Sequence, residues 1–477
     1  MGRKRYLIKF DNPYQIPIWA IFLVISLLST VLVAVDTSRP DDYGILFLLP
    51  LTFTVLSIAF SKVYSYIFSN IGVTLLLVLM FIRCVFLPLL MSNYGYETQI
   101  VRSGTGNIPN AVILMCYEML CLFVTISLTM AKYSTKSDYS DGNTSYTKRK
   151  YTDRAYIGLL IVAVLILVAC IRVAPVLMTG YRSILRIGEA DFATYEDTRL
   201  ISKYGTTTTI RFALVTGNYL MRALLAIVPG VLIIKLAEKR TFLRRLLSLL
   251  CCFIPTFFIG GVIARTLVYI VVLLLLYFYL YTPDLIPRKT ALIIACAGIA
   301  TLSWWAFKAN DSYGLQNLTN SLNAYFSGVN NTAATYNLKG DIGVRASYFL
   351  YDYIDAIPYS GTIFHSSHEL ISNFFNDSNG IRGQIPTTIG IGRFYFGPIF
   401  APIYSIIFAY VSVKAGEAVK ISLSTNPLRL IRLLLTAMYF AMGVIMYNIS
   451  ITMTNFFTIL FPMYLMELIA YKRNDNR

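Results

Sequence analysis

The stretch IWAIFLVISLLSTVLVAV, from Ile18 to Val35, contains no charged residue and is long enough to cross a lipid bilayer as a helix. It is one of several such runs, because 56% of the 477 residues are hydrophobic, only 14% are charged, and the mean hydropathy is +0.62. A soluble enzyme of this length does not have such a composition. The sequence therefore predicts an all-α polytopic membrane protein.

The other apolar runs, read in the same way, predict about twelve transmembrane helices. Their expected ranges are Ile18–Val35, Ile45–Phe60, Ile71–Leu90, Val112–Met130, Ile157–Met178, Phe212–Leu236, Leu246–Ile263, Leu267–Tyr281, Ala291–Ala306, Phe394–Val413, Leu430–Met446 and Ile451–Ala470. In the seventh run, the pair Gly260-Gly261 leaves a hairpin within the outer half of the membrane as an alternative.

Basic residues set the expected orientation. Lys and Arg cluster before the first run, in residues 132–154, 235–245 and 414–432, and in the tail. All these clusters fall on one side if every run crosses, and that side is cytoplasmic by the positive-inside rule. Both termini are then cytoplasmic, and the first helix is expected to be uncleaved, because no small-residue cleavage site precedes Asp36.

This topology divides the chain into three parts. Residues 1–306 carry helices one to nine with an outer loop at 179–211. Residues 307–388 form a large extracytoplasmic loop with short interfacial helices, and residues 389–477 hold helices ten to twelve and the cytoplasmic tail. A polar segment of this size suits an enzyme that acts on lipid-linked substrates at the membrane surface better than it suits a channel.

The net charge of +17 follows from the topology, so no nucleic-acid partner is expected. All seven cysteines lie in expected helices, where they are interpreted as small apolar side chains and not as metal ligands or disulfides.

The arginines of the outer side point to a phosphate ligand. Guanidinium groups are always charged and bind phosphate oxygens in two parallel hydrogen bonds, which Lys cannot do. Arg83, Arg172 and Arg265 lie within or at the outer end of apolar runs, where an unpaired charge is costly. Snorkelling, or pairing with a carboxylate such as Glu118, explains any one of them. Together they favour a shared anionic site near the outer headgroups.

Two outer loops are expected to complete that site. In the first, Arg182 and Arg186 are spaced i, i+4 and would share one face of a helix, although a solvated mixed-charge helix is the alternative reading. In the second, Arg345 and Asp352 lie in an aromatic run suited to the lipid interface, and Arg382 follows downstream.

The only two histidines, His365 and His368, lie in the same second loop. Their spacing occurs in metal sites, but no supporting set of carboxylates or thiolates is evident nearby. The candidates for a general base are therefore His368, His365 and Asp352, and surface or helix-capping histidines remain the alternative.

Several stretches resemble a known family. The run from Phe258 to Leu267, the pair Arg345 and Gly361, and the Gly-rich run from Ile389 to Pro398 are similar to elements of the Wzy-type polymerases of bacterial O-antigen and capsule repeat units. These polymerases are related to the O-antigen ligases within the GT-C superfamily. The chain departs from the pattern at Arg393, where members often carry Glu.

The resemblance implies a glycosyltransferase, a polysaccharide polymerase of the bacterial cytoplasmic (inner) membrane. Its donor is a glycan on undecaprenyl pyrophosphate, and its acceptor is a sugar hydroxyl of another lipid-linked repeat unit. The arginines would stabilise the leaving pyrophosphate without a metal or other cofactor. The implied partners are membrane lipids and a chain-length regulator protein.

Other functions remain open on the sequence alone. An O-antigen ligase would share the architecture. A metal-dependent GT-C transferase would use acidic residues of the first outer loop, where Asp36, Asp41 and Asp42 lie, although such a cluster is more often a polar turn. A non-enzymatic alternative is a flippase for lipid-linked oligosaccharides, with polar residues along a path at the midplane.

Overall fold

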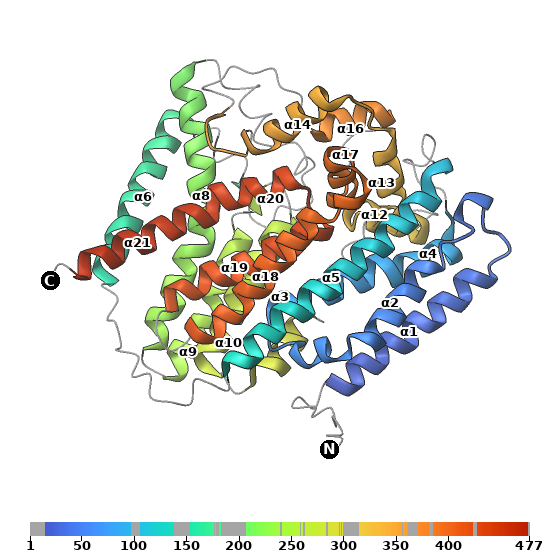
Figure 1. Cartoon of the computed structure of the whole chain (residues 1–477). Coiled ribbons are helices and arrows are strands. Elements are labelled where there is room, and N and C mark those ends of the chain that lie inside the picture. Colours follow the sequence, from blue (N-terminus) through green and yellow to red (C-terminus); the bar gives the residue numbers. More distant parts are fainter. Residues whose placement is uncertain are drawn as a thin grey trace.

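The computed structural model describes residues 15–96, 105–137, 153–175, 177, 181–182, 207–238, 241–257, 259–260, 263–282, 285–294, 296, 298, 314–354, 356–360, 371–380, 385–422 and 427–475. These residues are almost entirely helical (Figure 1). The only strands among them are β1 (Tyr181–Arg182) and β2 (Ile259–Gly260), which pair antiparallel. The expected all-α class is confirmed.

The helices follow the apolar runs closely in order and approximately in length. They are α1 Gln15–Val35, α2 Leu48–Ala59, α3 Ile71–Phe81, α4 Leu87–Tyr94, α5 Ile108–Ser137, α6 Asp153–Val173, α8 Thr208–Ala237, α9 Phe242–Cys251, α10 Ile263–Tyr281, α12 Gly314–Tyr325, α13 Val329–Ala334, α14 Ile342–Ile354, α16 Ile371–Asn379, α17 Thr388–Phe400, α18 Ile403–Ser422, α19 Pro427–Ile445, α20 Ile449–Asn455 and α21 Phe461–Asp475. A π-helical turn, Ile82–Phe86, joins α3 to α4, and a second, Phe456–Leu460, joins α20 to α21.

Seven helical stretches of the described residues are long and apolar enough to cross a membrane, or eight if α17 and α18 form one bent span. The seven are Gln15–Val35, Asp41–Ala59, Ile71–Tyr94, Ile108–Lys132, Tyr156–Val173, Thr208–Ala237 and Ile449–Ile469. The chain thus has the helices of a multi-pass membrane protein. The count of twelve spans, the side of the termini and the large outer loop stay predictions.

The expected seventh span is not a continuous helix. Helix α9 ends at Cys251, a 3-10 turn follows at Ile254–Phe257, and the chain then enters β2. Pro255 lies in that turn and has no backbone N–H to donate, which prevents an α-helix from continuing through it. Beyond the turn, Gly260 pairs with Tyr181 of β1, so this part of the run forms a two-stranded ladder.

The expected tenth span is bent by 106° between α17 and α18. The bend begins at Gly397, whose φ of 80° lies in the region that glycine adopts without strain, and Pro398 follows directly. The two helices approach so closely that a Cβ on Gly392 would lie 2.1 Å from the backbone oxygen of Ala401. Glycine in this run therefore has a packing role.

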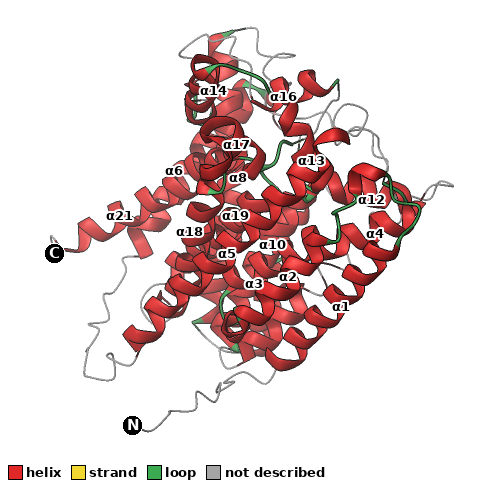
Figure 2. Ribbon diagram, turned by 45° about the vertical axis from the view of Figure 1, so that its right-hand side comes forward, coloured by secondary structure: helices red, strands yellow, loops and turns green. Residues whose placement is uncertain are grey.

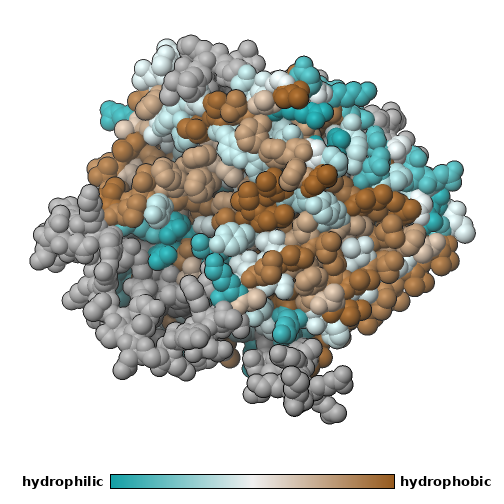
Figure 3. All heavy atoms as spheres, viewed as in Figure 1, coloured by the Kyte–Doolittle hydropathy of each residue, from teal (hydrophilic) through white to brown (hydrophobic). Residues whose placement is uncertain are grey.

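Helix α1 shows the polarity expected in lipid. Its buried side includes Ser26 and Ser29, whereas Val24 and Leu28 are 56% and 55% exposed. The hydroxyl of Ser29 donates to the backbone oxygen of Val85, 2.9 Å away. In water this arrangement would expose apolar surface, but in hydrocarbon the serines must find partners inside the protein. Figure 3 shows hydrophobic residues across the centre and lower right of one face of the molecule.

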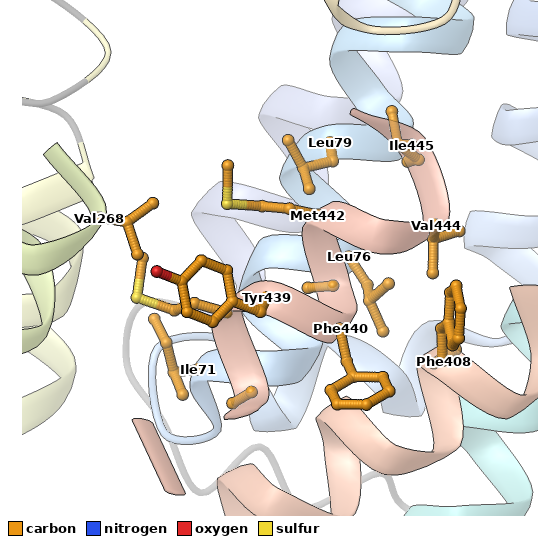
Figure 4. Packing of buried hydrophobic residues seen from close by; sticks show 14 of the residues in the cluster. Ile71, Leu76, Leu79, Val268, Phe408, Tyr439, Phe440, Met442, Val444 and Ile445 are labelled. Carbon is orange, nitrogen blue, oxygen red and sulfur yellow. The ribbon is translucent and has the colours of Figure 1, made fainter. Parts of the chain in front are cut away.

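The core lies where α3, α10, α18 and α19 meet. Side chains of α19, including Tyr439 and Met442, pack towards Leu76 of α3, Val268 of α10 and Phe408 of α18 (Figure 4). All five residues are buried. This packing holds the long helices together and provides a fixed base for the polar segment 314–380, whose helices α12, α13, α14 and α16 gather at one end of the molecule (Figures 1 and 2).

Candidate functional site

Arg83 joins the helical bundle to the polar segment. It lies in the π-helical turn between α3 and α4 and is only 3% exposed. Its guanidinium forms an ion pair with Glu118 of α5 at 2.6 Å, and its Nε donates to the backbone oxygen of Ser327 at 2.8 Å. The hydroxyl of Ser405, from α18, donates to the other Glu118 oxygen. Arg83 is therefore neutralised by Glu118, which is the alternative that the sequence left open for it.

Two other arginines meet at the contact between α14 and α17. The Nε of Arg345 donates to the backbone oxygen of Gly340 at 2.9 Å, and its guanidinium lies 5.8 Å from the ring centre of Phe394. The next residue along α17 is Arg393, whose guanidinium lies 3.8 Å from the ring centre of Tyr336. These residues bring two cations and two aromatic rings together from three elements.

Neither cation of this pair is neutralised within the described residues. Arg345 and Arg393 are close enough to repel each other, and neither forms an ion pair with a carboxylate in that part of the chain. Arg393 donates one hydrogen bond, from Nη2 to the backbone oxygen of Thr335 at 2.8 Å, and its buried Nε has no hydrogen-bond partner among the described residues. Two unneutralised guanidinium groups side by side are suited to an anion with several oxygens.

Asp352 lies on α14 two turns beyond Arg345 and is 1% exposed. Its Oδ2 accepts a hydrogen bond of 2.7 Å from the hydroxyl of Tyr395 of α17. The neighbouring Tyr353 donates to the hydroxyl of Tyr404 at 2.7 Å, and burial, with the nearby Asp352 charge, raises the pKa of the Tyr353 phenol. These bonds lock α14 onto α17 and α18, which fixes the position of Arg345. A carboxylate so deeply buried is suited to positioning α14.

The segments of Arg182 and Arg265 also converge. Arg182 is the second residue of β1 and pairs with Ile259 of β2, and Arg265 lies in the first turn of α10, six residues after Ile259. The ladder brings these two distant parts of the sequence to one place in the fold. Their side chains lie outside the description. Arg172, in the last turn of α6, is exposed.

Four predicted site residues lie outside the described residues. They are His365, His368, Arg186 and Arg382, and Gly361 of the family pattern lies outside as well.

The acidic residues of the first loop have structural contacts. Asp36 follows α1 and accepts hydrogen bonds from the hydroxyls of Tyr96 and Ser38. Slight burial acts to raise the pKa of Asp36, but these hydrogen bonds outweigh burial and leave the pKa below its usual value. Asp41 and Asp42 begin a 3-10 turn before α2. Among the described residues, no three His, Cys, Asp or Glu side chains are grouped so that they would hold a metal ion.

Sequence reasoning missed Arg393 and Tyr336 as members of the site. Arg393 stood out in the sequence only as a departure from a family pattern, and Tyr336 had no distinguishing neighbour. Their position next to Arg345 depends on how α17 packs, which no local pattern reveals. A signal was present in the glycines that flank Arg393, because a Cβ at Gly390 would lie 2.3 Å from the hydroxyl of Thr335.

No family model, curated protein or solved structure matches this chain.

Proposed function

We propose that the chain is a membrane glycosyltransferase of the repeat-unit polymerase type, acting at the outer face of the bacterial cytoplasmic membrane. The observation that carries the proposal is the pair of guanidinium groups of Arg345 and Arg393, which no carboxylate neutralises in the described part of the chain. An unneutralised cation pair at a helix contact is costly unless an anion binds there. The diphosphate of a polyprenyl-linked donor has the matching charge and oxygen geometry.

The proposed reaction is a single displacement at the anomeric carbon. A sugar hydroxyl of one lipid-linked repeat unit forms the new bond to this carbon, the bond to the pyrophosphate oxygen breaks, and the electron pair leaves with the diphosphate. The proton of the hydroxyl passes to a base, for which His368 and His365 are the candidates. Arg345 and Arg393 stabilise the negative charge that develops on the leaving group, and this needs no metal ion. Asp352 acts as a positioning residue that holds α14 against Tyr395.

The segments of Arg182 and Arg265 support a second cationic contact. Because β1 and β2 bring them together, both residues would approach the same lipid-linked substrate. Replacing Arg265 by Ala should abolish long glycan in cells while the protein still inserts into the membrane. Glycan of normal length in that variant would exclude this part of the site.

Binding of undecaprenyl pyrophosphate tests the site directly. Native mass spectrometry of the purified protein should show binding of undecaprenyl pyrophosphate in preference to uncharged undecaprenol. In the variant Arg345→Gln/Arg393→Gln, binding should weaken by about 100-fold, because two charge-assisted hydrogen bonds are worth roughly 3 kcal/mol or more together. The matched control is Lys339→Gln, which removes an exposed cation from the same segment and should bind as the wild type does.

Polymer formation tests the reaction itself. The purified protein in vesicles, supplied with lipid-linked repeat units extracted from cells that lack it, should produce glycans of increasing length in the presence of EDTA. Activity that EDTA abolishes and a divalent cation restores would favour the metal-dependent transferase. Substrate that crosses the membrane without growing in length would identify a flippase and overturn the proposal.

A further inference from the structure

Helix α9 exposes an apolar face that no part of the described chain covers. Phe242, Leu243 and Leu250 are 83%, 63% and 57% exposed, and Leu246 and Leu247 are also exposed. The polar side of the same helix faces the protein, where the hydroxyls of Ser248 and Tyr281 share a buried hydrogen bond of 2.9 Å. A helix with apolar side chains outside and polar side chains inside is built for hydrocarbon surroundings.

The length of α9 restricts it to one leaflet. Its ten residues span about 15 Å, which is half of the roughly 30 Å of a hydrocarbon core. Six of the seven candidate spans in the described residues come before α9, so it lies on the same side as the start of α1. In Figure 1, α9 lies at the end of the molecule opposite α14 and α16.

Two cations from different elements flank the C-terminal turn of α10 beside α9. The guanidinium of Arg245 lies 5.8 Å from the ring centre of Tyr281, and the ammonium of Lys289 lies 5.1 Å from the ring centre of Phe278. Neither forms an ion pair with a carboxylate within the described ranges. Aromatic rings beside cations are characteristic of the headgroup level of a membrane.

We propose that α9 and the end of α10 form a binding site for an anionic phospholipid. The headgroup binds between Arg245 and Lys289, and the acyl chains lie along Phe242, Leu246 and Leu250. The charge of the site and the apolar face of α9 match the two parts of such a lipid. The basic side of a membrane protein faces the cytoplasmic leaflet, where anionic lipids interact with juxtamembrane cations. This site is independent of the proposed glycosyl transfer and lies at the other end of the molecule.

The test is native mass spectrometry of the purified full chain with phosphatidylglycerol and with zwitterionic phosphatidylcholine as probes. The wild type should retain phosphatidylglycerol in preference to phosphatidylcholine. In Arg245→Gln/Lys289→Gln this preference should fall by about thirtyfold, since each cation near anionic headgroups contributes about 1 kcal/mol. The charge-preserving variant Arg245→Lys/Lys289→Arg should keep most of it.

The matched control is Lys62→Gln/Lys414→Gln, which removes two exposed cations elsewhere and should retain phosphatidylglycerol as the wild type does. An unchanged preference in the Arg245→Gln/Lys289→Gln variant, or an equal loss in the control, would overturn the proposal. If the first variant does not fold, Phe242→Ser/Leu246→Ser tests the acyl contact instead. Lipid retention equal to that of the wild type in this second variant would also count against the site.

Discussion

At the scale of single residues, Arg83 and Glu118 show how a charge is accommodated deep in this protein. The ion pair is 3% and 1% exposed and has hydrogen bonds to Ser327 and Ser405. A buried pair gains little over apolar residues of the same shape, but removing one partner leaves an uncompensated charge. The pair therefore fixes the polar segment on the bundle and makes that attachment sensitive to single substitutions.

This reasoning predicts a non-additive mutant cycle. Arg83→Met alone should lower the free energy of unfolding by about 3 to 5 kcal/mol, because Glu118 stays buried without its cation. Arg83→Met/Glu118→Leu should be less destabilised than the sum of the two single variants. Thermal unfolding of the purified variants in detergent measures both effects. Additive losses would show that the two side chains do not interact.

Individual residues of the site were only partly predictable. The value of Arg345 was visible because Arg among aromatic residues in a polar loop has few structural explanations. The pairing of Arg83 with Glu118 was also foreseeable, since a charge within an apolar run requires a partner. The meeting of Arg345 with Arg393 was not, because it depends on tertiary packing between α14 and α17.

At the scale of elements, the bend between α17 and α18 places Arg393 beside Arg345. The two helices fold at 106° with Gly392 against the backbone of Ala401, so the angle depends on the absence of a side chain at one position. Hydropathy predicted a single span for this run because it records composition and not backbone conformation. The break after α9 was missed for the same reason, although Pro255 and Gly260 marked it.

Substitution of Gly392 by Ala should open this bend. The added Cβ would meet the backbone oxygen of Ala401 at 2.1 Å, and a backbone neighbour cannot move aside as a side chain does. We expect a loss of roughly 1 to 3 kcal/mol or more in stability and weakened binding of undecaprenyl pyrophosphate. Thermal unfolding and native mass spectrometry provide the two measurements.

The control for this substitution is Gly158→Ala in α6, where the added Cβ has no neighbour within 4 Å. That variant should be as stable as the wild type or gain up to about 1 kcal/mol, since Ala favours a helix more than Gly does. If Gly392→Ala behaves like this control, the close approach does not set the bend.

At the scale of the whole molecule, the class of the protein was readable from composition and run length alone. Apolar runs have to form helices in lipid because every backbone polar group needs a partner there. Run length does not reveal which runs are broken, which helices stay within one leaflet, or which loops fold back onto the bundle. The topology therefore has to be tested on the intact protein.

Accessibility to a membrane-impermeant thiol reagent tests the orientation. In a variant whose seven cysteines are replaced by Ser, Lys339→Cys should be labelled in intact cells, because the polar segment is predicted to face outwards. Lys62→Cys, between α2 and α3, should be labelled only after the cells are permeabilised. Labelling of both positions from the same side would contradict the predicted topology.

The π-helical turn at Ile82–Phe86 has a consequence for how tolerant this chain is to changes in length. Such a turn carries one residue more than the α-helical path between the same two points. Deleting that residue would make the helix regular but rotate all that follows by about 100° around the axis. Tyr94 and the entry to the next loop would then point elsewhere, so a one-residue deletion inside a membrane helix would misplace the anchorage of a segment more than two hundred positions downstream.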